Sequence, residues 1–199
     1  MGKLFVIMGK SATGKDSLYQ KIVERHPELH EVVSYTTRPI RAGETYGKEY
    51  FFVNKEEMYE MQEQGKIIEC RKYDTVLGPW FYFTADDGQI DFQKGNYILI
   101  STLEGYEKLQ SFFGIGNIVP IYIEVDDFKR LERAVNRERS QKSPCVPELC
   151  RRFLADEEDF SEDKLQMAGI ETRILNDDLE QAMENIEILI QDRTGINEK

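Results

Sequence analysis

The residues with the clearest chemical potential lie near the start of the chain, in segment 9–15, which reads Gly-Lys-Ser-Ala-Thr-Gly-Lys. Glycines at its first and sixth positions and a lysine at its seventh are typical of a loop whose backbone N–H groups surround phosphate oxygens. An apolar run, 4–8, precedes the segment and a helix-like stretch, 17–25, follows it, as such a loop requires. The sequence therefore predicts binding of a nucleoside triphosphate, with Lys15 reaching the β- and γ-phosphates.

One position departs from the usual pattern of such loops. After Gly-Lys, a serine or threonine normally places its hydroxyl on the Mg²⁺ of the nucleotide, whereas here Asp16 holds that place and Ser17 follows. Mg²⁺ prefers hard oxygen ligands, so we expect Asp16 to bind the metal directly or through water. The residues expected to contact the triphosphate are Gly9, Lys10, Ser11, Ala12, Thr13, Gly14, Lys15, Asp16 and Ser17.

A second group of residues predicts another anion site. Arg38 and Arg41 lie three positions apart on either side of the helix-breaking Pro39, and Tyr50 follows in the same polar stretch. Two guanidinium groups can bind one phosphate together, and a phenol can add a hydroxyl donor. This stretch therefore indicates a site for a phosphomonoester. The alternative is two exposed arginines in a loop.

The composition limits the kinds of partner. With 199 residues and 40% hydrophobic content, the chain can form one domain with a substantial core. A net charge of −11 repels polyanions, which argues against nucleic acid or an anionic membrane surface as the main partner. The chain has no run of about eighteen apolar residues and no signal-peptide pattern, so we expect a cytoplasmic protein. Its three cysteines show no metal-ligand spacing, which favours reduced thiols.

An anionic substrate would need local cations in this acidic chain. Arginines occur in clusters that could supply them: Arg38 and Arg41; Arg130, Arg133, Arg137 and Arg139; and Arg151 and Arg152. The acidic run 156–159 is expected to be a solvated helix face without a chemical role.

Strands and helices are predicted to alternate through most of the chain. The segments 4–8, 31–35, 97–101, 119–125 and 171–175 are apolar and rich in β-branched residues, which is typical of buried strands. Apolar residues recur at helical spacing in 106–112, 128–139, 148–160 and 179–190. The pattern predicts an α/β three-layer sandwich with a five-stranded, mostly parallel sheet. Ligands on such sheets gather at the carboxyl ends of the strands, where segment 9–15 falls.

Two further parts are expected within this single domain, 1–199. Strand patterns at 50–53, 67–72 and 80–84, with a helix capped by Asn54, predict a small mixed lobe over 36–94. The stretch 140–147 has the composition of a mobile loop between basic helices, which predicts a lid over 127–164. The core is then assigned to 1–35, 95–126 and 165–199.

At this point the sequence resembles the guanylate kinase family over nearly its whole length. The resemblance implies an acceptor site for GMP, built from residues of the predicted lobe and the strand before it. Its phosphate would contact Arg38, Arg41 and Tyr50, and its base would lie near Ser34 and Glu69. The residues assigned to GMP are Ser34, Arg38, Arg41, Tyr50, Glu69 and Gly78.

The chemistry of Glu69 agrees with the role that the resemblance implies. Guanine presents N1–H and its N2 amino group side by side, and a carboxylate can accept hydrogen bonds from both. Adenine offers no such pair. The alternative is that Glu69 is an ordinary exposed residue of a strand.

The resemblance also implies a lid and an adenine site. Arg137 and Arg152 match the family's lid arginines, which would close over the phosphates and offset their charge. Asn176 would lie near the adenine of ATP, although Asn-Asp-Asp is equally a good helix cap. The implied reaction is transfer of the γ-phosphoryl group of MgATP to GMP by Lys15, Arg38, Arg137 and Arg152. The partners would be ATP and GMP, in a monomer or a homodimer.

Three departures from the family pattern stand out. Asp16 replaces a serine or threonine; Leu77-Gly78-Pro79 replaces a Tyr-Gly-Thr or Tyr-Gly-Ser element; and Ser101 or Thr102 stands where the family has an acidic residue. The Gly-Lys-Asp-Ser-Leu segment also resembles ribose 1,5-bisphosphate phosphokinase, so another phosphate-bearing acceptor is the alternative substrate. A non-catalytic guanylate-kinase-like binding module is the alternative from another class.

Overall fold

The computed structural model describes residues 1–41, 43–75 and 78–195. Its centre is a five-stranded sheet in the order β2-β7-β1-β8-β9, and every pairing in it is parallel. The strands are β1 (Leu4–Met8), β2 (Leu29–Glu31), β7 (Asn96–Ile100), β8 (Ile118–Glu124) and β9 (Arg173–Leu175). This confirms the predicted α/β class and the five-stranded sheet.

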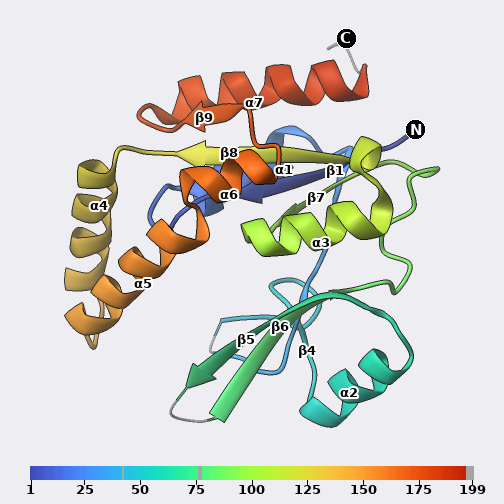
Figure 1. The fold of residues 1–199 in the computed structure, drawn as a ribbon, viewed down its shortest axis with the longest axis horizontal. Helices are drawn as coiled ribbons and strands as arrows, with labels where there is room; N and C mark the ends of the chain where they lie inside the picture. The colour runs from blue at the N-terminus through green and yellow to red at the C-terminus, as the bar shows by residue number, and fades with distance from the viewer. Residues whose placement is uncertain (42, 76–77, 196–199) are drawn as a thin grey trace.

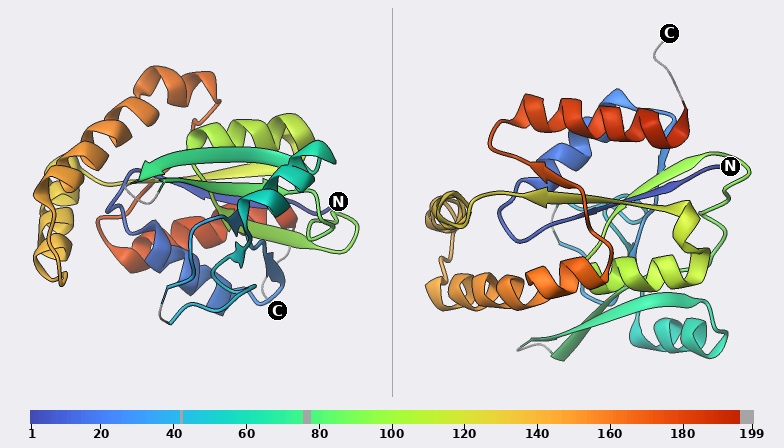
Figure 2. Two further views of the ribbon diagram at one scale, coloured as in Figure 1. Left: turned by 90° about the horizontal axis from the view of Figure 1, so that it is seen from below. Right: turned by 45° about the horizontal axis from the view of Figure 1, so that its top comes forward.

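Helices cover both faces of this sheet, as the views in Figures 1 and 2 show. Alternate residues of β1 face opposite sides: Leu4, Val6 and Met8 join one apolar cluster, whereas Phe5 and Ile7 join the other. The first face packs against α3 (Leu103–Phe113) and α6 (Glu162–Met167), and the second packs against α1 (Lys15–Arg25) and α7 (Leu179–Thr194). Because β1 is buried on both faces, it consists entirely of apolar residues.

The predicted strand over 31–35 is wrong in its bounds. The large sheet uses β2 (Leu29–Glu31), and the chain then crosses to a second sheet, where β3 (Tyr35–Thr36) begins. Val32 belongs to the core of the large sheet, whereas Tyr35 packs against the core of the small one. One apolar run therefore serves two cores, and residue 35 lies in the second sheet rather than in the first.

The second sheet forms the lobe below the large sheet in Figure 1. Its order is β4-β3-β6-β5, with β4 (Phe51–Phe52), β5 (Ile67–Thr75) and β6 (Gly78–Ala85). Helix α2 (Lys55–Glu63) covers it and begins with a capping box, in which Asn54 accepts from the N–H of Glu57 and Glu57 accepts from the N–H of Asn54. The predicted cap at Asn54 is thus confirmed.

The segment predicted to form a lid, 127–164, extends from one end of the large sheet (Figure 2). It contains α4 (Asp127–Arg139) and α5 (Val146–Asp159), so the loop between them spans 140–145. The predicted loop reached residue 147, but Pro147 lies in the first turn of α5, where its missing N–H costs no hydrogen bond. Helix α6, which the sequence did not predict, follows and buries Leu165.

The parallel topology determines where a ligand can bind. The ends of β1, β7, β8 and β9 all meet at one edge of the sheet, which brings together the loops that follow them. None of the helices in the described part of the chain has the length and apolar composition needed to cross a bilayer.

Candidate active site

The predicted phosphate-binding loop, 9–15, lies between the end of β1 and the start of α1. Gly14 has a left-handed conformation with φ 85°, and a Cβ on it would lie 2.5 Å from the Nδ2 atom of Asn176. A Cβ on Gly9 would lie 2.6 Å from the carbonyl oxygen of Ile123. Both positions therefore require glycine. Ala12 also has a positive φ, 65°, which is uncommon for a residue with a side chain.

The start of α1 has the properties of an anion site. Its first residue is Lys15, and no side chain caps its N-terminal N–H groups within the described residues. These N–H groups and the helix dipole favour a negatively charged group at this end of the helix. Lys15 forms no ion pair in the described part of the chain, so its ammonium is available to a ligand.

Asn176 stabilises this loop through a hydrogen bond to its backbone. Its side chain is buried and donates from Nδ2 to the backbone carbonyl oxygen of Thr13 at 2.7 Å, while the backbone carbonyl oxygen of Asn176 accepts from Nη2 of Arg133 at 3.1 Å. The cap of α7 is Asp178, whose carboxylate accepts from the N–H of Gln181. The Asn-Asp-Asp segment therefore does cap this helix, as the sequence left open, but through Asp178 and not through Asn176.

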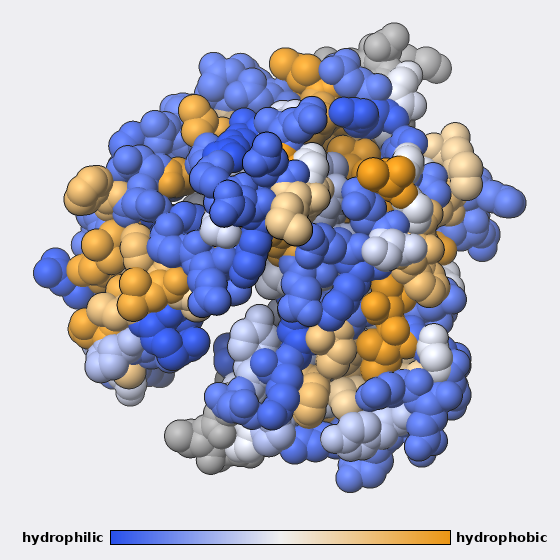
Figure 3. Space-filling view, viewed as in Figure 1, coloured by the Kyte–Doolittle hydropathy of each residue, from blue (hydrophilic) through white to orange (hydrophobic). Residues whose placement is uncertain are grey.

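A cavity of about 1330 Å³ opens beside the loop. In the space-filling view of Figure 3, the surface is hollowed between the lid on the left and the lobe below. The residues that line the cavity come from α1, the lobe and the lid, and include Lys15, Asp16, Ser34, Tyr50, Arg71, Tyr73, Trp80, Tyr82 and Arg152. The triphosphate loop and the lobe thus face one shared space.

Arg38 lies directly behind the wall of this cavity. Only 4% of it is exposed, and its two terminal nitrogens donate to the carboxylate oxygens of Glu44 at 2.7 and 2.6 Å. Its Cζ atom lies 5.2 Å from the ring centroid of Tyr50, at the distance of a cation–π contact. Glu44 also accepts from the backbone N–H of Arg41 at 2.7 Å. One carboxylate therefore binds the guanidinium group of Arg38 and the backbone of Arg41.

These contacts change the acidity of two groups. The hydrogen bonds from Arg38 lower the pKa of Glu44 from 4.5 to about 2, so this carboxylate stays charged in mild acid. Burial raises the pKa of Tyr50 above its ordinary value, which keeps its hydroxyl protonated as a donor.

Glu69 is also buried behind the cavity wall, with 2% of its surface exposed. Its Oε1 atom accepts from Thr84 at 2.8 Å and from Nη2 of Arg71 at 3.1 Å, and its Oε2 atom accepts from Nε of Arg71 at 3.1 Å. Arg71, which the sequence did not single out, is the member of this group that lines the cavity. The alternative of an exposed strand residue is wrong for Glu69.

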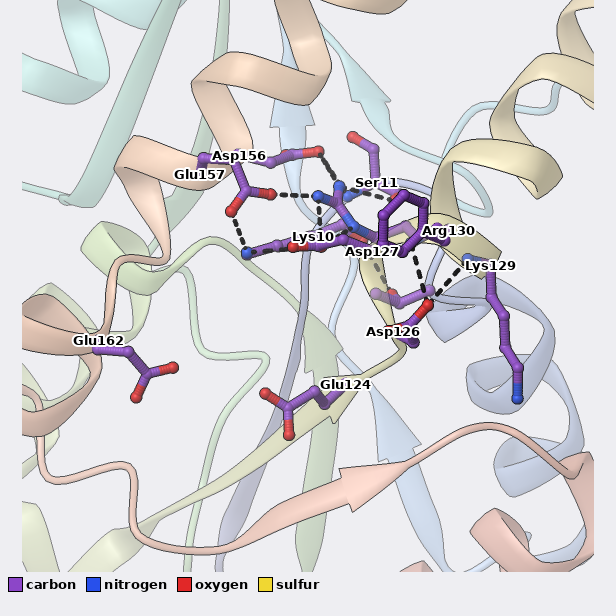
Figure 4. A network of polar contacts seen from close by, with 12 residues as sticks. Lys10, Ser11, Glu124, Asp126, Asp127, Lys129, Arg130, Asp156, Glu157 and Glu162 are labelled. Atoms are coloured by element: carbon purple, nitrogen blue, oxygen red, sulfur yellow. Dashed lines mark hydrogen bonds and ion pairs between the residues drawn. The ribbon is translucent and has the colours of Figure 1, made fainter.

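Figure 4 shows a polar network that joins the lid to the phosphate-binding loop. Arg130 on α4 is fully buried and donates to Asp127 at 2.9 Å, to Asp156 at 3.2 Å and to Glu157. Asp156 also accepts from the backbone N–H of Ser11 at 2.8 Å. The network therefore connects α4 and α5 with the phosphate loop.

Two predictions from the sequence are corrected here. Asp156 and Glu157 are not a solvated face without a role, because they bind Arg130, and Glu157 also binds Lys10 at 2.6 Å. Arg130 is not a free cation for a substrate, because three carboxylates and the ring of Phe153, 4.0 Å from its Cζ atom, surround it. No signal for this network is visible in the sequence, because the charged residues of each helix form an ordinary polar pattern and most of their partners lie far away in the chain.

The two predicted lid arginines have different surroundings. Arg152 lines the cavity and lies 3.8 Å from Glu138, and its Nε atom is buried without a hydrogen-bond partner in the described structure. Arg137 is exposed near the end of α4 and is not among the residues that line the cavity.

Comparison with known proteins gives the family of this chain. The family model described as guanylate kinase matches residues 1–193. The chain belongs to the guanylate kinase family. The guanylate kinase of a Nostoc species is 31% identical over 191 residues, covering 95% of this chain and 89% of that protein. That of a Synechococcus species is 33% identical over 194 residues, covering 95% of this chain and 82% of that protein.

A solved guanylate kinase also shares the fold. The crystal structure of the guanylate kinase from Anaplasma phagocytophilum superimposes with a TM-score of 0.65 at 24% identity, covering 97% of this chain and 87% of that one. At this identity the likeness supports the fold assignment alone.

The predicted site residues fall into two groups, according to whether they line the cavity. Those on the cavity are Lys15, Asp16, Ser34, Tyr50 and Arg152. Those that are not among its lining residues are Gly9, Lys10, Ser11, Ala12, Thr13, Gly14, Ser17, Arg38, Arg41, Glu69, Gly78, Arg137 and Asn176. Leu77, part of the departure at 77–79, lies outside the described residues.

Replacing Arg130 with methionine should destabilise the protein strongly. The change leaves three carboxylates close together without their buried cation, which typically costs about 3–5 kcal/mol. The free energy of unfolding in urea measures the loss. Lys129→Ala is the control, because Lys129 forms an exposed pair with Asp177 and should cost less than about 1 kcal/mol. Equal stability of the two variants would contradict the role of Arg130.

The pair formed by Arg38 and Glu44 predicts a pH dependence. The pKa of Glu44 is lowered in the folded state, so its contribution to stability is present above about pH 4.5 and is lost as the pH falls toward 2. The difference in unfolding free energy between the wild type and Glu44→Gln should therefore shrink over this interval. A difference that is constant between pH 6 and pH 2 would contradict the assignment.

Proposed function

We propose that this protein catalyses reversible transfer of the γ-phosphoryl group of MgATP to the phosphate of GMP, giving ADP and GDP. Membership of the guanylate kinase family supports this activity. The observation that carries it in the structure is the shared cavity, which Lys15 enters from the phosphate-binding loop and Ser34 and Tyr50 enter from the acceptor side. A phosphoryl group could cross between the two sides without leaving the protein.

The ATP side uses main-chain groups more than side chains. The N–H groups at the start of α1 would bind the β-phosphate, and Lys15 would follow the charge of the transferring group. Asn176 supports this arrangement through the carbonyl oxygen of Thr13, so we assign it to loop positioning.

The donor groups at the site fit a Mg²⁺ ion that arrives with the nucleotide. Asp16 is exposed, lines the cavity and supplies one hard oxygen ligand. The described residues contain no cluster of three or more His, Cys, Asp or Glu side chains that could hold a metal alone. Mg²⁺ is commonly bound by one or two carboxylates together with substrate phosphates, so Asp16 is the residue that would hold it. When bound, the ion would neutralise phosphate charge.

The acceptor side would hold GMP through the lobe. Tyr50 would donate its hydroxyl to the phosphate. Arg38, whose guanidinium Glu44 holds, and Arg41, whose backbone Glu44 binds, would supply positive charge beside it. The base would lie toward Ser34 and Glu69. Gly78, the first residue of β6, has no side chain, so a ligand could approach its backbone closely.

No covalent intermediate is needed for this reaction. An oxygen of the acceptor phosphate forms a bond to the γ-phosphorus as the bond to the ADP oxygen breaks, and the protein positions the reactants and stabilises charge. Arg152 already lines the cavity, whereas Arg137 would reach the phosphates only when the lid moves. Closure would also exclude water, which would otherwise hydrolyse ATP.

Lys15→Ala should lower kcat by about 100-fold or more, because the variant loses a charge that stabilises the transferring group. Lys21→Ala is the control: Lys21 is also on α1, but it pairs with Glu180 on α7 and should leave turnover unchanged. ADP release in a coupled assay measures both variants. Near-normal turnover of Lys15→Ala with an intact fold would remove the phosphate-loop assignment.

The substrate is tested by the same assay with different acceptors. GMP and dGMP are expected to stimulate ADP release, whereas AMP, UMP and CMP should not. If ribose 1,5-bisphosphate is the best acceptor in this assay, the proposed function is wrong and the protein is a sugar-phosphate kinase. No saturable binding of ATP and Mg²⁺ would place the chain among binding modules.

A further inference from the structure

The base side of the cavity contains an arginine where a carboxylate alone was expected. Arg71 lines the cavity with 16% of its side chain exposed, whereas Glu69 has 1% of its side chain exposed and lies behind it. A ligand that enters from the cavity therefore reaches the guanidinium group together with, at most, the outer edge of the carboxylate.

The hairpin of β5 and β6 builds this arrangement through its register. Glu69 pairs with Thr84, Arg71 with Tyr82 and Tyr73 with Trp80. Because alternate strand residues share a face, these three pairs form a row on one face of the hairpin. Tyr73, Trp80 and Tyr82 line the cavity, so the row gives aromatic surfaces for a planar base around one fixed cation.

The hydrogen bonds of Glu69 leave it little capacity for a ligand. Its Oε1 atom already accepts from Thr84 and Arg71, which uses both lone pairs, and its Oε2 atom accepts once from Arg71. One lone pair, on Oε2, remains. Arg71 uses one hydrogen on Nε and one on Nη2 for these bonds, and its other N–H groups donate to no acceptor in the described part of the chain.

Three hydroxyl groups lie next to this pair. Thr84 already donates to Glu69; Thr102 accepts from the N–H of Gly105 as the cap of α3; and the hydroxyl of Ser101 is buried without a partner among the described residues. A Cβ on Gly105 would lie 3.5 Å from the carboxyl carbon of Glu69 and 2.2 Å from the Ser101 hydroxyl oxygen, so these groups are close neighbours. Each of these three hydroxyls can offer a base only a neutral hydrogen bond, and no second carboxylate is among these neighbours.

We propose that Arg71 and Glu69 read a 6-oxopurine as a unit, and that the 2-amino group meets, within the described part of the chain, no second carboxylate beside Glu69 but at most a neutral hydroxyl such as that of Ser101. This inference rests on the proposed function. Arg71 donates to O6, and the remaining lone pair of Glu69 accepts from N1–H. Adenine reverses both groups, with an amino group at C6 and an unprotonated N1, so it leaves both protein groups mispaired. The acceptor class is therefore 6-oxopurine nucleoside monophosphates, which includes IMP as well as GMP.

Two analogues separate this reading from recognition of the amino group. IMP keeps O6 and N1–H but lacks the 2-amino group, whereas 2-aminopurine riboside monophosphate keeps the amino group but lacks O6 and N1–H. We expect IMP to retain at least about a tenth of the kcat/KM of GMP, and the 2-aminopurine nucleotide to fall about 100-fold or more. A kcat/KM for IMP below a tenth of that for GMP, or below that for the 2-aminopurine nucleotide, would overturn the proposal.

A substitution tests Arg71 itself. Arg71→Gln should lower kcat/KM for GMP and IMP alike by about 10-fold to 100-fold, the usual effect of losing such a base contact, and should reduce the preference for GMP over AMP. Lys108→Ala is the control, because it removes one exposed positive charge on α3 that pairs with Glu104. An unchanged preference for GMP over AMP in Arg71→Gln would overturn the role of Arg71.

The experiment also distinguishes failure of the inference from failure of the proposed function. Titration with MgATP first checks that wild-type and variant proteins bind the donor equally, so a misfolded variant is recognised. If GMP stimulates ADP release and IMP does not, this inference alone is wrong. If no nucleoside monophosphate stimulates ADP release from protein that binds MgATP, the proposed function is wrong.

Discussion

The site depends on one electrostatic constraint: a chain with a net charge of −11 must hold the phosphates of two nucleotides. At the cavity, the structure combines Lys15 with arginines whose orientation carboxylates fix: Arg38 is held by Glu44 and Arg71 by Glu69. Arg130 is held by three acids, and it joins the lid to the loop rather than serving a phosphate. Lys15 is different, since it has no ion pair within the described residues. Glu44, Glu69 and the three acids around Arg130 thus serve as supports for cations.

The fold places these pairs around one cavity. The parallel sheet brings the phosphate loop, the lid and the segment before α7 to one edge, while the second sheet carries the acceptor residues opposite them. Arg130 and Asp156 link the lid to the backbone of Ser11, so the position of the lid is coupled to the loop that would hold ATP. A movement of the lid would have to exchange or preserve these buried contacts.

Local patterns in the sequence predicted much of this arrangement. The phosphate loop needs only a short motif between a strand and a helix, and the cap of α2 at Asn54 depends on a residue only three positions away. The crossing at Val32 could not be predicted, because one apolar run supplies two cores. Two of the partners of Arg130 come from another helix, α5, which the periodicity of the sequence does not reveal. The position of Arg71 between Glu69 and the cavity depends on the register of β5 and β6, which periodicity also does not encode.

The central claim is that the two phosphate sites open on one cavity at a distance that a phosphoryl group can cross. Calorimetric titration with adenosine and guanosine joined through a five-phosphate bridge tests it most directly. One molecule per chain should bind at least about 100-fold more tightly than ATP or GMP alone, because the second half binds within the same complex. Binding no tighter than that of ATP, or displacement by ATP but not by GMP, would contradict a shared cavity.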